Sequence, residues 1–215
     1  MPDLLFLIQH LLDSSALDSA IEVDAAKIGI VGHSLGGWTV LAAPDLEPRV
    51  RAVVAFAPGG SSNPKPGILQ MKLAFEWRRD VPTLYLAAEG DISLPLSGMY
   101  ELYNRTPATK QIAILRRADH LHFVDNVEEE HEIVRGMQWT GDLAWVADEM
   151  LPIAQLCSGE QAHLFVRGLT LCHMDAILKL QEEATRLLSA DLQAELAGRG
   201  VDAIVHKPGS RIPAR

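Results

Sequence analysis

The sequence is poor in cysteine, in basic residues and in long apolar runs, and we find no internal repeat or low-complexity segment. Its 215 residues include two cysteines, Cys157 and Cys172. Neither lies in a CxxC spacing, and two thiols are too few for a disulfide framework, so we expect both to be buried and free. No run of about eighteen apolar residues is present, and therefore no membrane span is expected.

Acidic residues outnumber basic ones, which narrows the class of partner. The formal net charge is −9, with a sequence pI of about 5.3. This negative charge argues against nucleic acid or an anionic membrane surface as a partner. A small molecule is the partner that we expect. Residues 1–15 lack the basic start of a signal peptide, and their apolar residues fall on one helical face, which predicts an amphipathic helix. If Met1 is the true start, a cytoplasmic location follows.

The chain is expected to form one domain of the α/β class. With 48% hydrophobic residues it can bury a sizeable core. Short apolar runs alternate with helical patterns through the first 120 residues, which is typical of a parallel sheet. Strands are expected near residues 28–31, 50–57, 82–88 and 110–116, and helices over 35–46, 68–80 and 96–106. Residues 124–205 are predicted to be helical, and 206–215 to be a flexible tail.

One short segment carries a motif for nucleophilic catalysis. Gly32-His33-Ser34-Leu35-Gly36 follows an apolar run and precedes a helical pattern. A nucleophilic serine must expose its hydroxyl on a sharp strand-to-helix turn, where the backbone is strained and neighbouring chains pass closely. Small residues two positions before and after the serine relieve that crowding. Ser34 is therefore the candidate nucleophile.

The motif "GHSLGG" resembles the nucleophile elbow of the α/β-hydrolase family, in which the acid and then the histidine follow the serine along the chain. The resemblance implies that the acid lies in "TLYLAAEGD", where Asp91 fits better than the alternative Glu89. It implies that the histidine lies in "RRADHLHF", where His120 fits better than His122. In this interpretation Asp91 would orient the imidazole of His120, and His120 would take the proton of Ser34.

Other residues near these segments are candidates for binding. The Leu35 N–H is expected to contribute to an oxyanion hole, and His33 and Trp38 are candidate substrate-binding residues because they lie beside Ser34 in sequence. The loop 58–67 is a further candidate, and Trp139 and Trp145 either line an acyl pocket or belong to the core. No cofactor is expected. A metal at the closely spaced histidines is unnecessary beside a serine elbow.

Beyond these motifs, the span up to about Phe123 resembles the dienelactone-hydrolase-like, platelet-activating-factor-acetylhydrolase-like and polyester-hydrolase-like branches of the family. Measured against the family, the elbow strand comes early, with about three strands after it and none before it. This comparison predicts a partial α/β-hydrolase fold: a mostly parallel sheet flanked by helices, a helical C-terminal extension and a missing N-terminal part. One oxyanion donor would be missing too, and the open sheet edge could pair with a second copy.

The sequence thus favours a serine esterase that hydrolyses carboxylic esters through an acyl-enzyme. Two alternatives stay open. The chain could be a non-catalytic or weakly active hydrolase remnant, or it could be an acyltransferase or peptidase that uses the same elbow chemistry.

Overall fold

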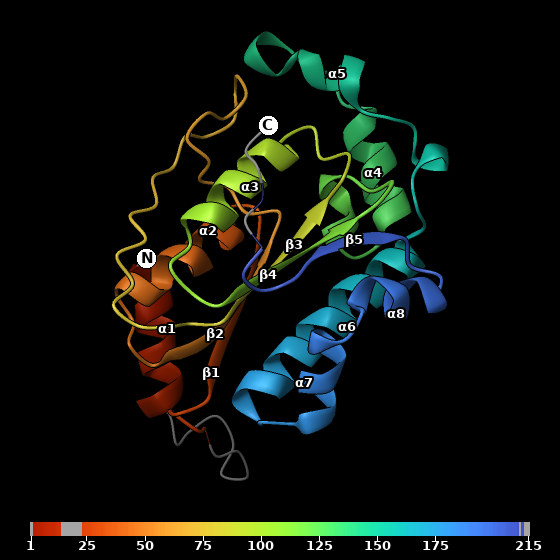
Figure 1. Ribbon diagram of the computed structural model, residues 1–215. Coiled ribbons are helices and arrows are strands. Elements are labelled where there is room, and N and C mark those ends of the chain that lie inside the picture. Colours follow the sequence, from red (N-terminus) through yellow and green to blue (C-terminus); the bar gives the residue numbers. More distant parts are fainter. Residues whose placement is uncertain (1, 14–22, 211, 213–215) are drawn as a thin grey trace.

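A computed structural model describes residues 2–13, 23–210 and 212 of the chain. Its centre is a five-stranded sheet in the order β1-β2-β3-β4-β5 (Figure 1). The first four strands are parallel, and β5 pairs antiparallel with β4. The strands are β1 (Ile28–His33), β2 (Val50–Phe56), β3 (Thr83–Ala88), β4 (Lys110–Leu115) and β5 (Ala203–His206).

The inner strands are apolar because helices cover both faces of the sheet. Every residue of β3 is buried, which explains why that strand appears in the sequence as a continuous apolar run rather than an alternation. Its alternate side chains belong to two different cores: Tyr85 packs in one, and Leu84 and Leu86 pack in the other. The sheet therefore forms the middle layer of an α/β sandwich.

Two groups of helices cover these faces (Figure 1). Helices α1 (Pro2–Asp13), α2 (Leu35–Ala42) and α3 (Leu96–Arg105) pack on the Tyr85 side. Helices α6 (Gly159–Leu178) and α8 (Leu192–Gly198) pack on the Leu84 side, and α7 (Glu182–Ser189) lies against α6. The expected helices around residues 1–15, 35–46 and 96–106 are thus present.

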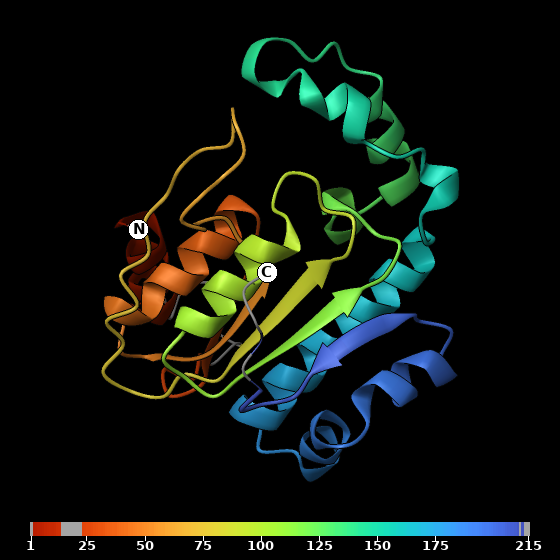
Figure 2. The ribbon, with the colours of Figure 1, turned by 45° about the horizontal axis from the view of Figure 1, so that its top comes forward.

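The remaining helices lie beyond the carboxyl ends of β3 and β4 (Figure 2). They are α4 (Val127–Arg135) and the short α5 (Trp145–Glu149). Four single turns of 3₁₀ helix occur at Ala43–Asp45, His120–Phe123, Gly141–Leu143 and Ile153–Gln155. No helix in the described residues is both long and apolar enough to cross a bilayer.

The prediction of a helix over 68–80 is wrong, because that segment is extended. Leu73 and Trp77 are buried, and their spacing of four resembles a helical face. The backbone here is bonded instead by side chains: Trp38 Nε1 donates to the Lys72 carbonyl (3.0 Å), and Arg105 Nη2 donates to the Leu73 carbonyl (2.7 Å). These long-range bonds replace the bonds that a helix would make internally.

The C-terminal end also differs from expectation. Residues 203–206 form strand β5, where the sequence pattern predicts helix, and His206 is part of that strand rather than of a flexible tail. Ile212 is buried, and its carbonyl accepts a 2.7 Å hydrogen bond from Asn104 Nδ2. Cys157 and Cys172 are buried free thiols, as predicted.

The packing of α6 predicts opposite outcomes for two neighbouring substitutions. Phe165 is fully buried against the sheet, whereas Leu164 is 52% exposed. Phe165→Ala should lower the free energy of unfolding by about 3–5 kcal/mol because it opens a cavity. Leu164→Ala, the matched control, should stay within about 0.5 kcal/mol of wild type. Urea unfolding monitored by circular dichroism measures both, and equal effects would contradict the placement of α6.

Candidate active site

Ser34 lies at the sharp turn between β1 and α2, in a strained backbone conformation. Its φ of 56° and ψ of −112° are unfavourable for a residue with a Cβ. The turn is stabilised by hydrogen bonds to the end of β2 and the loop after it. The Ser34 N–H donates to the Phe56 carbonyl (3.0 Å), and the Ser34 carbonyl accepts from the N–H groups of Trp38 and Gly59 (both 3.1 Å). Strain of this kind occurs at functional sites, where the surrounding structure determines it.

The two glycines of the motif differ in what surrounds them. A Cβ on Gly32 would lie 2.2 Å from the Gly36 carbonyl oxygen, so only glycine fits there. A Cβ on Gly36 would meet no heavy atom within 4 Å apart from its chain neighbours and the nearby backbone of its own helix. The crowding expected at both positions is therefore present only at Gly32.

The hydroxyl of Ser34 lies at one end of a chain of hydrogen bonds. Ser34 Oγ is 2.9 Å from His120 Nε2, and His120 Nδ1 is 2.7 Å from Asp91 Oδ2. The three residues follow β1, β4 and β3 respectively. Parallel strands end at the same edge of the sheet, which is why residues so far apart in sequence meet.

The Asp91 carboxylate is fixed by its own loop. Its side chain is 1% exposed, and Oδ1 accepts hydrogen bonds from the N–H groups of Ser93 (2.9 Å) and Leu94 (2.8 Å). Oδ2 is thereby directed at His120 Nδ1. A carboxylate in this position holds the proton on Nδ1 and leaves Nε2 to accept the proton of Ser34.

The alternative acid and histidine contact other partners. Glu89 accepts from the Arg117 N–H (3.1 Å) and lies beside Arg116. His122 is fully buried and hydrogen-bonded to Asp119. In the part of the chain that the structure describes, it is Asp91 and His120 that lie in line with Ser34.

The electrostatic setting favours a basic imidazole at His120. Burial alone would lower its pKa, but the carboxylates of Asp91 and Asp119 together raise it above the usual value. The neighbouring ring of His33 is centred 4.5 Å from that of His120. Burial and the nearby His120 lower the pKa of His33 to about 4, so His33 is neutral at pH 7.

A cavity of about 420 Å³ opens at Ser34. Its walls are mainly aliphatic, sulfur-containing and aromatic side chains, which suit an apolar ligand. The lining residues besides Ser34 and His120 are Leu35, Gly59, Gly67, Ile68, Leu69, Met71, Ile92, Ser93, Leu94, Asp119, Leu121, Val134, Trp139, Leu143, Val146 and Met150. Leu35 is the first residue of α2, so its N–H has no partner within the helix and is available to a ligand.

The four other candidate binding residues lie in different places. Trp139 lines the cavity. Trp145 does not line it: its Nε1 donates to the Pro66 carbonyl (3.1 Å) and joins α5 to the loop after β2. His33 and Trp38 are also absent from the lining. His33 packs behind His120, and Trp38 packs at the core that α2 covers.

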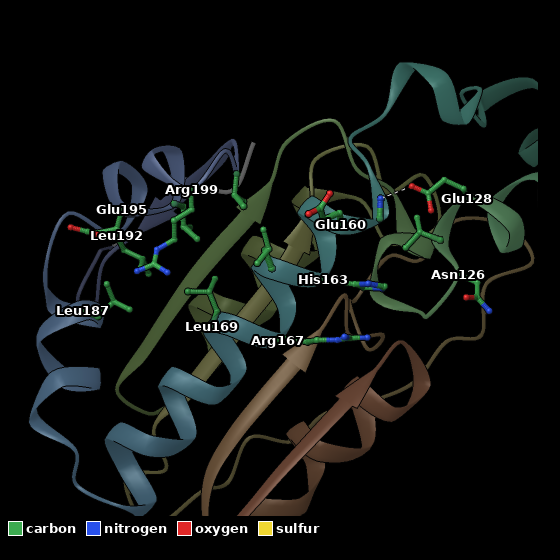
Figure 3. A pocket seen from close by; sticks show the side chains of 16 residues that line it. Asn126, Glu128, Glu160, His163, Arg167, Leu169, Leu187, Leu192, Glu195 and Arg199 are labelled. Carbon is green, nitrogen blue, oxygen red and sulfur yellow. Dashed lines mark hydrogen bonds between the residues drawn. The ribbon is translucent and has the colours of Figure 1, made fainter.

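A larger cavity of about 680 Å³ lies elsewhere, between α6, α8 and the start of α4 (Figure 3). Leu169, Leu192 and Leu196 line its inner side, and His163, Arg167 and Arg199 are among its polar residues. None of the residues that line it belongs to the Ser34 site. Size alone therefore does not identify the functional cavity. Across the described residues, no three His, Cys, Asp or Glu side chains are grouped so as to hold a metal ion.

The chain is similar in sequence to known proteins. No family model matches the chain. Over 160 residues it is 26% identical to cutinase Est1 of Thermobifida alba, a match that covers 73% of this chain and 49% of that protein. Over 118 residues it is 25% identical to the bis(hydroxyethyl) terephthalate hydrolase of Streptomyces coelicolor, covering 54% of this chain and 34% of that protein. The chain thus spans about half or less of the relatives that it matches.

The unequal surroundings of the two glycines generate a stability prediction. Gly32→Ala should lower the free energy of unfolding by about 1–3 kcal/mol, because the new methyl group would overlap the Gly36 carbonyl. Gly36→Ala should be neutral or stabilising by up to about 1 kcal/mol, since alanine is the better helix former. Thermal and urea unfolding measure both variants. A Gly32→Ala protein as stable as Gly36→Ala would contradict this view of the turn.

Proposed function

We propose that the protein is a serine hydrolase that cleaves carboxylic esters, with Ser34 as nucleophile, His120 as general base and Asp91 as the residue that orients His120. The observation that carries this proposal is the unbroken hydrogen-bond chain from Ser34 Oγ through the His120 ring to the buried Asp91 carboxylate. The strained turn at Ser34, the apolar cavity beside it and the similarity to two ester hydrolases support the same conclusion.

In the acylation step, His120 Nε2 takes the hydroxyl proton as Ser34 Oγ attacks the carbonyl carbon of the ester. Negative charge develops on the former carbonyl oxygen. The Leu35 N–H, at the positive end of the α2 dipole, stabilises that charge. Asp91 stabilises the imidazolium without accepting its proton. The carbon–oxygen bond to the alcohol then breaks, and His120 gives the proton to the departing alkoxide, which leaves an acyl-serine.

Deacylation repeats these steps with water. His120 Nε2 removes a proton from a water molecule, and the resulting hydroxide attacks the acyl-serine carbonyl. The bond to Ser34 Oγ breaks, the proton returns to Ser34 from His120, and a carboxylic acid is released. The enzyme is then ready for a further turnover.

The cavity walls indicate which esters are suitable. Val134, Trp139 and Leu143 offer aliphatic and aromatic surface and no charge, so an apolar acyl or aromatic group is the expected occupant. One relative is named as a cutinase and the other as a bis(hydroxyethyl) terephthalate hydrolase. Small aromatic and medium-chain esters, including bis(hydroxyethyl) terephthalate, are therefore the first substrates to test.

Substitution of the nucleophile tests the proposal directly. Ser34→Ala should lower kcat for p-nitrophenyl butyrate and for bis(hydroxyethyl) terephthalate by about 10³-fold or more, because no acyl-serine can form. Its circular dichroism spectrum should match wild type. The control Ser189→Ala removes a hydroxyl on α7 that bonds only to the Thr185 carbonyl, and it should keep full activity. Unchanged turnover in Ser34→Ala would refute the proposed function.

The choice of acid predicts a pH effect. Catalysis needs neutral His120, and the pKa of His120 is raised, so kcat/KM should fall as pH falls through a value above about 6.5. Asp91→Asn should lower kcat by about 10⁴-fold and move this acid limb to lower pH, because the raising charge is lost.

Glu89→Gln is the matched control for the choice of acid, since Glu89 lies on the same loop and bonds to the Arg117 N–H. Its pH–rate profile should match wild type. A larger effect on kcat from Glu89→Gln than from Asp91→Asn would reverse the assignment.

A further inference from the structure

A second polar cluster is buried directly beside His120, and the catalytic steps above do not use it. It consists of Asp119, His122 and His131, all of which are buried, the two histidines fully. Asp119 Oδ1 is 2.8 Å from His122 Nδ1 and accepts from the Leu121 N–H (3.0 Å). Asp119 Oδ2 is 2.8 Å from His131 Nε2. Burying three ionisable groups costs free energy. The bond between Asp119 and His122 offsets part of this cost, whereas His131 lies close to Asp119 but neither of its ring nitrogens makes a well-aligned hydrogen bond.

His122 lies between polar groups of the turn and of the segment before α6. Its Nδ1 faces the Asp119 carboxylate, and its Nε2 donates to the Cys157 carbonyl (3.1 Å). Burial alone would lower the pKa of His122, but these hydrogen bonds raise it to about 10. The Asp119 N–H donates to Nδ1 (3.0 Å), which closes a capping box around the 3₁₀ turn. His122 therefore ties the turn to the segment before α6.

The cluster fixes the turn that carries His120. Asp119 is the N-cap of the His120–Phe123 turn, so its carboxylate bonds set the direction in which the chain enters it. A backbone bond from the Cys157 N–H to the Arg117 carbonyl joins the same two segments a second time. His120 is thus the first residue of a turn that is held on both sides.

The third member of the cluster brings in the wall of the cavity. His131 lies on α4, and so does Val134, which lines the cavity at Ser34. The contact between His131 and Asp119 joins this helix to the residue next to His120. A shift of α4 would therefore displace the His120 imidazole as well as the wall of the substrate cavity.

We propose that Asp119, His122 and His131 are positioning residues that hold the His120 imidazole in line with Ser34 and Asp91, and that they couple α4, as the wall of the substrate cavity, to that alignment. The proposal rests on the proposed function, since it concerns the same site. Asp119 also contributes to the raised pKa of His120, because its negative charge favours the imidazolium. None of the three residues is needed to touch the substrate for this role.

Other ionisable groups face this region and contribute to the pH dependence of kcat/KM. His33 packs on His120 from β1, and Asp91 faces it from the loop after β3. From α4, Glu132 Oε1 lies 3.6 Å from His131 Nδ1, and the hydrogen bond from the Gly159 N–H lowers the pKa of Glu128. His33 is neutral across the usual assay range. The nearby charges that raise the pKa of His120 are therefore those of Asp91 and Asp119.

Asp119→Asn is the variant that tests the proposal. Loss of the Asp119 carboxylate should let the His120 ring shift by up to about an ångström. The kcat for p-nitrophenyl butyrate should then fall about 10–100-fold, while KM changes less than about twofold. The acid limb of the kcat/KM profile should move to lower pH, because the carboxylate that helps to raise the His120 pKa is gone. Substitution of a residue that acts only on stability would neither lower kcat selectively over KM nor shift the acid limb of the pH profile.

Two further variants separate positioning from folding. His131→Leu removes the polar contact from α4 to Asp119 and should reproduce the kcat loss, whereas His131→Gln keeps a polar side chain at this position and should recover at least half of the logarithmic loss. Asp125→Asn is the control, because it removes a nearby acidic charge whose side chain is 83% exposed. It should leave kcat and the acid limb unchanged.

Nitrogen-15 NMR of the histidine rings makes the test independent of turnover. Asp119→Asn should lower the pKa of His120 and of His122, because the Asp119 carboxylate helps to raise both. If wild type hydrolyses no ester, the proposed function fails, yet the NMR titration still tests the cluster. Changes in kcat and in the His120 titration in Asp119→Asn and His131→Leu that are no larger than those in Asp125→Asn would overturn the positioning role.

Discussion

The site depends on one constraint, which is that the carboxyl ends of β1, β3 and β4 lie at a single edge of a parallel sheet. Ser34, Asp91 and His120 are separated by tens of residues. Ser34 directly follows β1, and Asp91 and His120 lie in the segments after β3 and β4. The sheet fixes the strand ends to within a residue, and the loops need only to direct the side chains. This explains how 2.7 Å and 2.9 Å hydrogen bonds form between such distant parts of the chain.

Buried charge is handled in two different ways around His120. Asp91 offers one oxygen to backbone N–H groups and the other to His120, so its carboxylate is ordered before any substrate arrives. Asp119 contacts His122 through Oδ1 and His131 through Oδ2. These contacts fix the position of the turn and take no part in proton transfer. In the proposed function the first arrangement serves the chemistry, and the second preserves its geometry at the cost of burying three ionisable side chains.

Much of this arrangement could be predicted from the sequence, because it is encoded locally. Strands β1 to β4 appear as apolar runs, and the turn at Ser34 appears as a glycine pattern. The rest depends on non-local contacts. Strand β5 is four residues long and is defined by pairing with β4, while the extended segment near Leu73 is held by Trp38 and Arg105. His131 has no motif around it, and it meets Asp119 only because α4 packs on the turn.

In the proposed function, Ser34, His120 and Asp91 act as one reactive unit. The most direct measurement is labelling of the intact chain with a fluorophosphonate, followed by peptide mapping by mass spectrometry. The account predicts a single adduct, on Ser34, whose rate of formation rises with pH as His120 loses its proton and which is lost in His120→Ala. A folded protein that takes up no label, or labelling at another serine, would contradict it.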